Sequence, residues 1–257
     1  MPTVETVKGS LWYEDNRDPA AHLPVTLMVH GAGGTHLDWP AELRRLPEAN
    51  AVIPDLPGHG RSPGPGRQTV SAYAADMAAL LDALKIPKAI IAGHSMGGAI
   101  ALTMALSYPD RLSGLILVGT GAKLAVHPDI LNNVLTNTRK AMDIISEWEW
   151  GEGADEQVRR LSRRRLAETR PEVLHGDYQA CNAFDVRALL NRIHTPTLII
   201  GGAADKMTPL KFSAYLQEQI AGSRLATISG GGHKMMLEQP QAVAGEVQQW
   251  LAEQKED

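Results

Sequence analysis

The chain has 257 residues, of which 44% are hydrophobic and 21% are charged, and its formal net charge is −4 at pH 7. A chain of this length and apolar content can bury one large core, and single α/β domains often reach this size. The charge balance lacks the basic excess of nucleic-acid-binding domains and the acidic excess of disordered tails. We therefore predict one globular unit whose partner is a small molecule and not nucleic acid.

Residues 1–13 do not resemble a secretory signal. They include Glu5 and Lys8 and lack a basic start followed by an apolar run. No later stretch approaches the roughly 20 apolar residues that are needed to cross a bilayer. The single cysteine, Cys181, cannot form an internal disulfide, which suits a reducing compartment. We expect a cytoplasmic protein that does not associate with membranes.

Short apolar runs of strand length alternate with longer helical patterns from Pro24 onward. Such repeated strand–turn–helix units predict an α/β fold with a mostly parallel central sheet flanked by helices. The expected strands are Val25–Val29, Ala51–Ile53, Ala89–Ala92, Leu115–Val118, Thr197–Ile200 and Leu225–Ile228, and the expected helices are Ser71–Leu84, Gly97–Ser107, Leu210–Ile220 and Pro240–Ala252. Before them, Thr3–Lys8 and Leu11–Glu14, separated by Gly9-Ser10, are interpreted as an antiparallel hairpin that begins the sheet.

This alternation stops between Gly121 and about Arg192. The segment is rich in helix formers and holds several possible helix caps but no convincing strand. We interpret it as a helical cap inserted over the sheet. The expected organisation is a core domain made of residues 1–120 and 193–257, with a helical cap insertion at residues 121–192.

The turn after the expected strand at residues 89–92 carries the most informative motif. It reads Gly93-His94-Ser95-Met96-Gly97 and leads directly into a helical pattern, which is G-x-S-x-G between a strand and a helix. A serine in such a turn has a strained backbone, and small residues two positions before and after it prevent a clash between strand and helix. Gly93 and Gly97 meet that need. Ser95 is therefore the candidate nucleophile.

Two further segments strengthen a resemblance to the α/β-hydrolase superfamily. The run His30–Gly34 follows the strand at residues 25–29, as the family's oxyanion loop does. The turn Asp55–Ser62, with the sequence D-L-P-G-H-G-R-S, looks like the family's turn after the next strand. The resemblance extends from about Leu11 to Leu251 and is weakest in the helical insertion. It implies the α/β-hydrolase fold for the whole core.

The resemblance also implies roles for four residues besides Ser95. The family places its base between the last strand and the final helix, where His233 follows three glycines. It places the acid after the penultimate strand, where Asp205 lies. The order Ser, Asp, His matches the family's chain order. The oxyanion hole would use the backbone amides of Met96 and Ala32, which would stabilise the charge that develops on a carbonyl oxygen under attack.

These positions predict a serine hydrolase, most specifically a carboxylesterase, that cleaves small-molecule esters through an acyl-enzyme. Carbon–carbon bond hydrolases, lactonases, thioesterases, cofactor-free perhydrolases and aminopeptidases share these catalytic parts, so fold and triad cannot separate them. A ligand receptor that retains the triad is an alternative from another class. The oligomeric state stays open.

Other residues carry weaker expectations. Trp39, Trp148 and Trp150 are candidate substrate contacts, and packing against the core is an equal alternative for each. Asp55 is expected to shape its turn, and the arginines between residues 159 and 165 are expected to form a solvated helical face. No cluster of His, Cys and Asp has metal-ligand spacing and no phosphate-loop pattern occurs, so we expect no metal and no cofactor.

Overall fold

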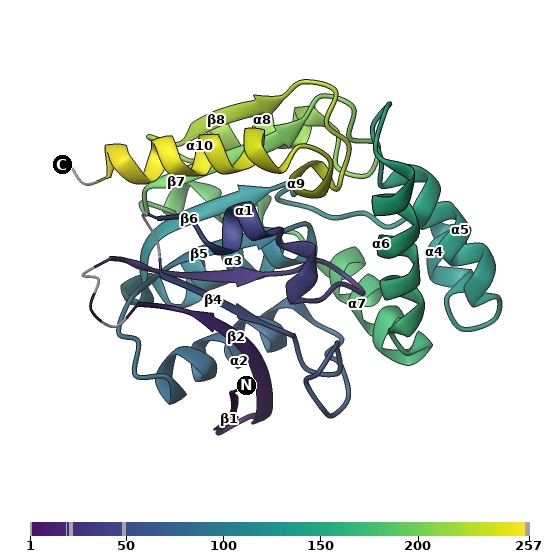
Figure 1. Ribbon diagram of the computed structural model, residues 1–257, viewed down its shortest axis with the longest axis horizontal. Helices are drawn as coiled ribbons and strands as arrows, with labels where there is room; N and C mark the ends of the chain where they lie inside the picture. Colours follow the sequence, from purple (N-terminus) through teal and green to yellow (C-terminus); the bar gives the residue numbers. More distant parts are fainter. Residues whose placement is uncertain (1, 19, 21–22, 48–49, 255–257) are drawn as a thin grey trace.

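A mostly parallel sheet forms the centre of the molecule in the computed structural model, which describes residues 2–18, 20, 23–47 and 50–254 (Figure 1). Within these residues its strands follow the order β1-β2-β4-β3-β5-β6-β7-β8. The strands are β1 (Thr3–Thr6), β2 (Gly9–Asn16), β3 (Val25–Val29), β4 (Asn50–Pro54), β5 (Ala89–His94), β6 (Leu112–Val118), β7 (Thr197–Gly202) and β8 (Arg224–Ile228). β1 and β2 pair in antiparallel fashion, as do β2 and β4, while the neighbours from β4 to β8 run parallel. The predicted α/β fold is confirmed.

The N-terminal hairpin is present, but its turn lies two residues earlier than predicted. Gly9 and Ser10 already belong to β2, and Thr6 pairs with Gly9 across the turn. The Thr6 hydroxyl accepts a hydrogen bond from Lys8 N at 3.0 Å and donates one to Gly9 O at 2.8 Å. The side chain of Thr6 thus closes the turn at Val7-Lys8. The prediction placed the turn at Gly9-Ser10 because glycine and serine are typical turn residues.

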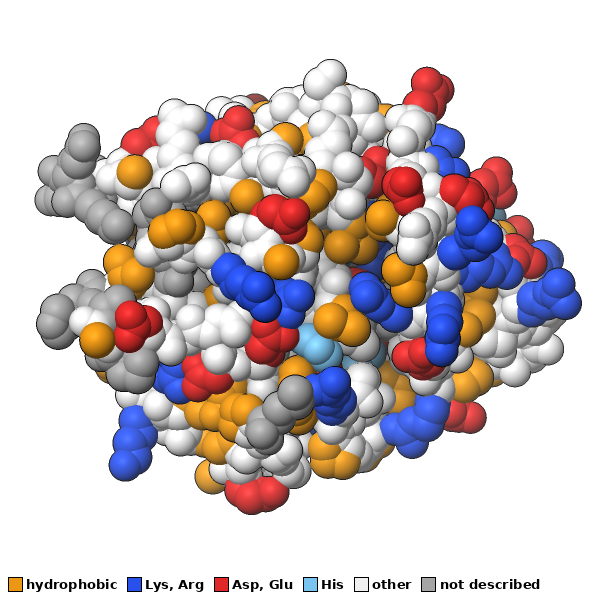
Figure 2. All heavy atoms as spheres, viewed as in Figure 1, with side chains coloured by type: hydrophobic (Ala, Val, Ile, Leu, Met, Phe, Trp, Pro, Cys, Tyr) orange, Lys and Arg blue, Asp and Glu red, His pale blue; other side chains and the backbone are white. Residues whose placement is uncertain are grey.

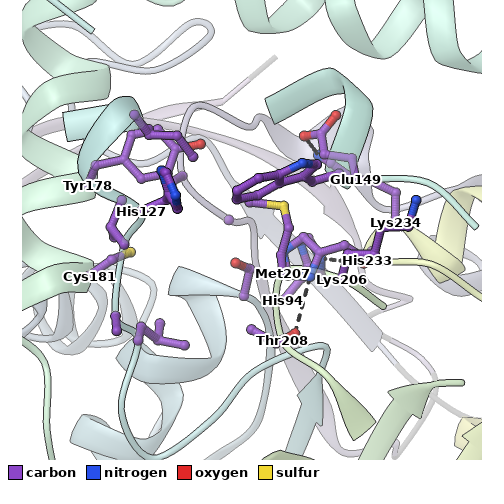
Figure 3. Close-up of a pocket in the computed structure, with 18 of the residues that line it drawn as sticks. His94, His127, Glu149, Tyr178, Cys181, Lys206, Met207, Thr208, His233 and Lys234 are labelled. Carbon is purple, nitrogen blue, oxygen red and sulfur yellow. Dashed lines mark hydrogen bonds and ion pairs between the residues drawn. The ribbon is translucent and has the colours of Figure 1, made fainter. Parts of the chain in front are cut away.

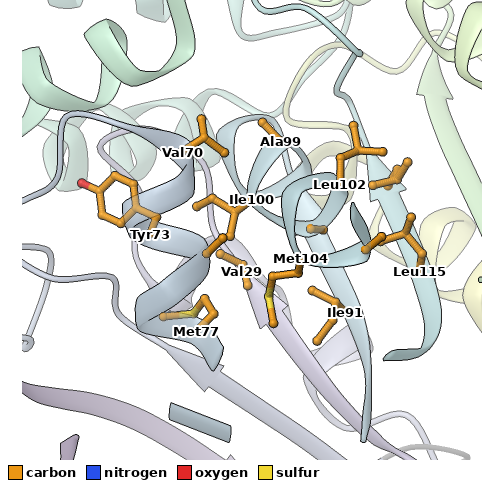
Figure 4. Packing of buried hydrophobic residues seen from close by; sticks show 14 of the residues in the cluster. Val29, Val70, Tyr73, Met77, Ile91, Ala99, Ile100, Leu102, Met104 and Leu115 are labelled. Atoms are coloured by element: carbon orange, nitrogen blue, oxygen red, sulfur yellow. The ribbon is translucent and has the colours of Figure 1, made fainter. Parts of the chain in front are cut away.

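Helices cover both faces of the sheet because successive residues of a strand point to opposite sides. On β3, Leu27 and Val29 belong to the apolar layer under α2 (Val70–Ala83) and α3 (Met96–Ser107). Met28 belongs to the layer under α1 (Ala41–Arg44) and α10 (Pro240–Glu253). Figure 4 shows the first of these layers between α2, α3 and the strands. The helices of the core are α1 (Ala41–Arg44), α2 (Val70–Ala83), α3 (Met96–Ser107), α8 (Leu210–Gln219), α9 (Met235–Glu238) and α10 (Pro240–Glu253). Strands covered on both faces are apolar at nearly every position, which explains their continuous apolar runs.

Residues 121–192, called the cap segment below, leave the sheet after β6 and return at β7. The segment contains α4 (Pro128–Asn133), α5 (Thr138–Trp148), α6 (Glu156–Glu168) and α7 (Pro171–Ala183), which Figure 1 shows grouped at one end of the sheet. These helices share a small apolar core made of Ile130, Val134, Ala141, Ile145, Leu166, Leu174 and Tyr178. The two ends of the segment meet, because Lys123 and Asp185 form a bridge and Val186 N donates to Ala122 O at 2.8 Å.

Candidate active site

Ser95 lies in the sharp turn between β5 and α3. Its backbone has φ of 53° and ψ of −116°, a conformation that residues with a Cβ rarely adopt. The turn is held in place by the sheet, since Ser95 N donates to Val118 O at 3.0 Å. At its other side the Ser95 carbonyl accepts hydrogen bonds from Gly98 N and from the Thr120 hydroxyl. The surrounding structure therefore maintains a strained serine at the carboxyl end of a central strand.

The two glycines that flank Ser95 allow α3 to begin directly against the sheet. A Cβ on Gly93 would clash with the backbone of Gly97, and a Cβ on Gly97 would clash with the carbonyl oxygens of Val29 and His30. Because these neighbours are backbone atoms, no rotation of a side chain can relieve the clash. The glycine spacing read from the sequence is therefore a packing requirement of the turn.

Gly97→Ala is expected to lower the free energy of unfolding by about 3 kcal/mol, because the added methyl group must displace the backbone of β3. The measurement is the midpoint of urea unfolding. Gly245→Ala is the matched control, since a Cβ there meets no heavy atom within 4 Å. In the interior of α10 that change should raise stability by up to about 1 kcal/mol. Equal midpoints for the two variants would contradict this account of the turn.

The side chains of His233 and Asp205 are in direct contact. His233 Nδ1 lies 2.9 Å from Asp205 Oδ2, and both side chains are almost fully buried. Asp205 also accepts hydrogen bonds from Met207 N, Thr208 N and the Thr208 hydroxyl. Burial raises the pKa of Asp205, but the charge and hydrogen bond of His233, together with those from Thr208, outweigh burial and hold this pKa below its ordinary value. The carboxylate is therefore ionised at neutral pH and fixes Nδ1 of the ring as the side that faces it.

Ser95 and His233 open into one pocket, a cavity of about 330 Å³ (Figure 3). Figure 3 shows His233 and Thr208 on one side of this cavity and Cys181 and Tyr178 of α7 on the other. The hydroxyl of Ser95 makes no hydrogen bond among the described residues and is partly exposed. A hydroxyl and an imidazole thus line one cavity, and a carboxylate holds the remote nitrogen of the imidazole; these are the types of group that nucleophilic catalysis by serine requires.

Two backbone amides near the Ser95 turn are the candidate donors for an oxyanion. Among the hydrogen bonds of the described residues, none has the amide of Ala32 or Met96 as its donor. Ala32 lines the pocket beside Ser95 and Gly31, and Met96 N is the first amide of α3. Amides at the start of a helix carry partial positive charge, which favours a negative ligand. The geometry is thus compatible with the oxyanion hole that the sequence predicts.

The three tryptophans named in the sequence have different positions. Trp148 lines the pocket and meets the ring of His127 edge-on, with centroids 5.2 Å apart. Trp39 lies 1% exposed in the apolar layer under α1 and α10, and Trp150 lies 4% exposed outside the pocket lining. For Trp39 and Trp150 the structure therefore shows the alternative of a buried ring that does not line the pocket. Trp39 directly follows a short 3-10 helix at residues 36–38, and Trp150 lies two residues after the end of α5. Their positions in the sequence do not reveal where such rings point.

A buried charge cluster at the edge of the pocket had no signal in the sequence. Lys234, next to the base, pairs with Asp38 at 2.8 Å and lies 3.9 Å from Glu149 of the cap segment. Burial lowers the pKa of Lys234, but the two carboxyl groups outweigh burial and raise it. Burial also raises the pKa of Glu149, against the opposing charge of Lys234. From sequence alone, Lys234 would be expected to be solvated, because its carboxylate partners Asp38 and Glu149 come from two distant segments of the chain.

Asp55 and Cys181 are two further buried residues with titratable side chains. Asp55 accepts hydrogen bonds from His36 and from Arg61 N, so it holds its own turn together. Burial raises the pKa of the Cys181 thiol, which lines the pocket but is a poor nucleophile in that state. Among the described residues, no group of three or more His, Cys, Asp or Glu side chains could hold a metal ion.

Three arginines of α6, namely Arg160, Arg163 and Arg164, lie on an exposed surface of balanced charge. The expected solvated face does not include Arg159 and Arg165, which are half-buried and donate to Gly151 O and Leu37 O. Arg160 and Arg164 each pair with a glutamate one turn away, and Arg163 pairs with Asp143 of α5. Figure 2 shows basic and acidic side chains interleaved over this end of the molecule. Exposed pairs of this kind contribute little to stability, commonly about 0–1 kcal/mol.

In the described part of the chain, none of the helices combines the length and the apolar character needed to cross a bilayer.

Comparisons with known proteins agree with this fold. The profile of the family described as the alpha/beta hydrolase fold matches residues 24–240. A protein of Caulobacter vibrioides (strain NA1000 / CB15N), provisionally named carbamate hydrolase RutD, is 30% identical over 253 residues, covering 93% of this chain and 94% of that protein. A solved hydrolase from Pseudomonas aeruginosa PA01 has a TM-score of 0.86 at 31% identity, with 97% of each chain covered. A solved thermophilic esterase from Thermogutta terrifontis has a TM-score of 0.85 at 28% identity, with 98% of each chain covered. The chain belongs to the α/β hydrolase fold family.

Proposed function

We propose that this protein is a serine hydrolase that cleaves carboxylic esters of small molecules through an acyl-enzyme. One observation carries the proposal: the strained Ser95 and His233 line the same cavity, and Asp205 holds the remote nitrogen of that histidine at 2.9 Å. The similarity to a solved esterase at 28% identity is in keeping with it. We assign Ser95 as the nucleophile, His233 as the base and Asp205 as the residue that orients the base.

The proposed reaction has two steps that use the same residues. In the first, Ser95 Oγ attacks the ester carbonyl while its proton passes to His233 Nε2, and the carbonyl oxygen becomes an oxyanion held by the amides of Ala32 and Met96. The intermediate collapses, the proton of His233 passes to the leaving alcohol, and the acyl group stays on Ser95. In the second step water attacks the acyl-serine with the same proton transfer and releases the acid.

The cavity favours small substrates with an apolar acyl or alcohol group. Its volume of about 330 Å³ lies at the lower end of ligand pockets. Apolar side chains from the cap segment and from α8 line it, namely Leu124, Val126, Ile130 and Phe212. We propose short or medium acyl esters as the substrate class, acted on without metal or cofactor. The cap segment supplies much of this lining, so we propose that it controls substrate choice.

The experiment is a kinetic panel of aryl and alkyl esters with graded acyl length. The same panel includes a lactone, a thioester, a vinylogous diketone and an aryl carbamate, together with an assay for peracid formation. The carbamate is included because a relative is provisionally named a carbamate hydrolase. The largest kcat/KM is expected for an ester of short or medium acyl length. A larger kcat/KM for any other compound would mean that the protein has that activity and is not primarily an esterase. Slow turnover with tight retention of a ligand would favour a receptor.

Trp148→Ala is expected to change acyl-length preference, because its ring forms part of the cavity wall. The ratio of kcat/KM for a hexanoate over an acetate ester should change about tenfold, the discrimination that a few methylene contacts provide. Trp150→Phe is the matched control, since Trp150 lies two residues away and is buried outside the lining. It should lower stability without changing the ratio. An equal change of the ratio in both variants would refute a specific contribution of Trp148.

A further inference from the structure

We propose that Asp177 of the cap helix α7 is a positioning residue for the oxyanion hole. In this proposal its carboxylate fixes the amide of Gly33 and thereby aims the neighbouring amide of Ala32 into the pocket. The inference rests on the proposed function, because it concerns how efficiently the same site stabilises an oxyanion. It extends the role of the cap segment from lining the pocket to assembling the catalytic loop.

The backbone of the oxyanion loop is held on both sides of Ala32. Gly33 N donates to Asp177 Oδ2 at 2.8 Å, and Gly33 O accepts from the Thr169 hydroxyl at 3.0 Å. On the other side, Gly31 O accepts from Gly34 N at 3.1 Å. Each peptide group is planar, so the Ala32 N–H shares its plane with the Gly31 carbonyl. The planes before and after the Ala32 Cα are therefore both fixed, and the second is fixed by the cap segment.

Glycine at position 33 makes this external support necessary. Gly33 has φ of +63°, in the left-handed region that glycine enters easily and leaves as easily. A Cβ there would lie 2.6 Å from a terminal methyl of Leu166 and 2.7 Å from one of Leu174, so apolar side chains of the cap helices lie directly against the loop. The sequence thus provides a permissive backbone at the loop. Its conformation must come from the hydrogen bonds of Asp177 and Thr169.

Asp177 is itself rigidly placed. It is fully buried, and besides Gly33 N it accepts from the Tyr73 hydroxyl at 2.5 Å and from His59 Nε2 at 2.8 Å. His59 also contacts Pro57 O through Nδ1 at 3.1 Å, so a charged ring that donates from both nitrogens satisfies both contacts. Burial lowers the pKa of His59, but Asp177 outweighs burial and raises it. All three partners of the carboxylate are then hydrogen-bond donors.

Asparagine at position 177 should disturb this arrangement without changing its shape. Loss of the negative charge favours neutral His59, whose Nδ1–H stays with Pro57 O and whose Nε2 then becomes an acceptor. The amide of Asn would turn its NH₂ toward Nε2. Gly33 N and His59 Nε2 share the oxygen Oδ2 of Asp177, so the same NH₂ would face the Gly33 amide. Two donors would then oppose each other, and the loop would lose its anchor.

The test compares Asp177→Asn with the parent protein by steady-state kinetics on the best ester. We expect kcat to fall about 10- to 100-fold, less than the loss on deleting an oxyanion donor outright, with KM changed less than about threefold. Affinity for a trifluoromethyl ketone should fall in proportion. Ser95 Oγ adds to the carbonyl carbon of that inhibitor, its proton passes to His233, and the carbonyl oxygen becomes the oxyanion. Affinity for the product acid should stay unchanged.

Asp76→Asn is the matched control. Asp76 is a buried carboxylate on α2 that pairs with Arg67 at 2.7 Å and has no contact with the oxyanion loop. Its variant should lose stability but keep kcat and the inhibitor affinity of the parent. If Asp177→Asn does not fold, Thr169→Val decides, because it removes only the bond to Gly33 O. That variant should lower kcat about three- to tenfold, which is less than the loss expected when an oxyanion-hole donor is removed completely.

Parent values of kcat and inhibitor affinity in Asp177→Asn, or in Thr169→Val where the first variant does not fold, would overturn the proposal. So would equal losses in Asp177→Asn and Asp76→Asn. Failure of the proposed function looks different. In that case the parent protein itself would show no ester turnover and no reaction of Ser95 with the ketone.

Discussion

Ser95→Ala is expected to abolish ester hydrolysis while the fold and the pocket persist. The change removes the attacking oxygen and leaves the backbone, since the Ser95 hydroxyl makes no hydrogen bond among the described residues. By the precedent of serine proteases, loss of the nucleophile lowers kcat on the order of 10⁶-fold. Substrate binding should change little, because the oxyanion amides and the cavity wall remain.

The measurement for this variant combines turnover with covalent labelling. A fluorophosphonate should label the parent protein on the peptide that contains residue 95 and should not label Ser95→Ala. Ser107→Ala, at the exposed end of the same helix, is the control and should be labelled and active like the parent. Labelling of parent and Ser95→Ala at the same rate, on another serine, would remove Ser95 from the mechanism.

Asp205→Asn is expected to lower turnover by about 10⁴-fold, which is the loss in the serine-protease precedent. In the proposed mechanism the carboxylate of Asp205, 2.9 Å from Nδ1 of His233, keeps the ring proton on Nδ1 so that Nε2 can accept the proton of Ser95. An asparagine can instead donate from its NH₂ to Nδ1, which places the ring proton on Nε2. It also removes the charge that stabilises the imidazolium formed during attack. Binding of substrate should change much less than turnover.

The discriminating experiment is the pH profile of single-turnover acylation. In the parent protein the rate should rise with pH as the histidine base loses its proton, because only its neutral form accepts one. The pKa of Asp205 is held below its ordinary value, so its carboxylate stays ionised through this range. Its stabilising effect on the fold is present above the ordinary aspartate pKa and is lost only as the pH falls through the lowered value. An unchanged rate in Asp205→Asn would mean that another carboxylate orients the base, with Asp55 as the next residue to test.

The sequence alone was enough to predict those features that depend on local sterics and on chain order. The turn around Ser95 was readable because only glycine fits at positions 93 and 97, where backbone lies against backbone. The candidate positions of Asp205 and His233 were implied by the resemblance to the α/β-hydrolase superfamily, and the structure brings them together because loops after parallel strands meet at one edge of the sheet. The cap segment was visible as a break in the βα alternation. Each of these signals lies within a short stretch of chain.

The tertiary structure decided everything that requires a partner far away in the chain. Trp39 and Trp148 look equivalent in sequence, yet one is buried in the core and the other lines the pocket. The pair of Lys234 and Asp38 joins residues 196 positions apart, and the bond from Gly33 to Asp177 spans 144 positions. A polar side chain has the same local pattern whether it meets water or a buried partner. Only packing of the cap segment on the core excludes water and brings the Asp177 carboxylate to the amide of Gly33.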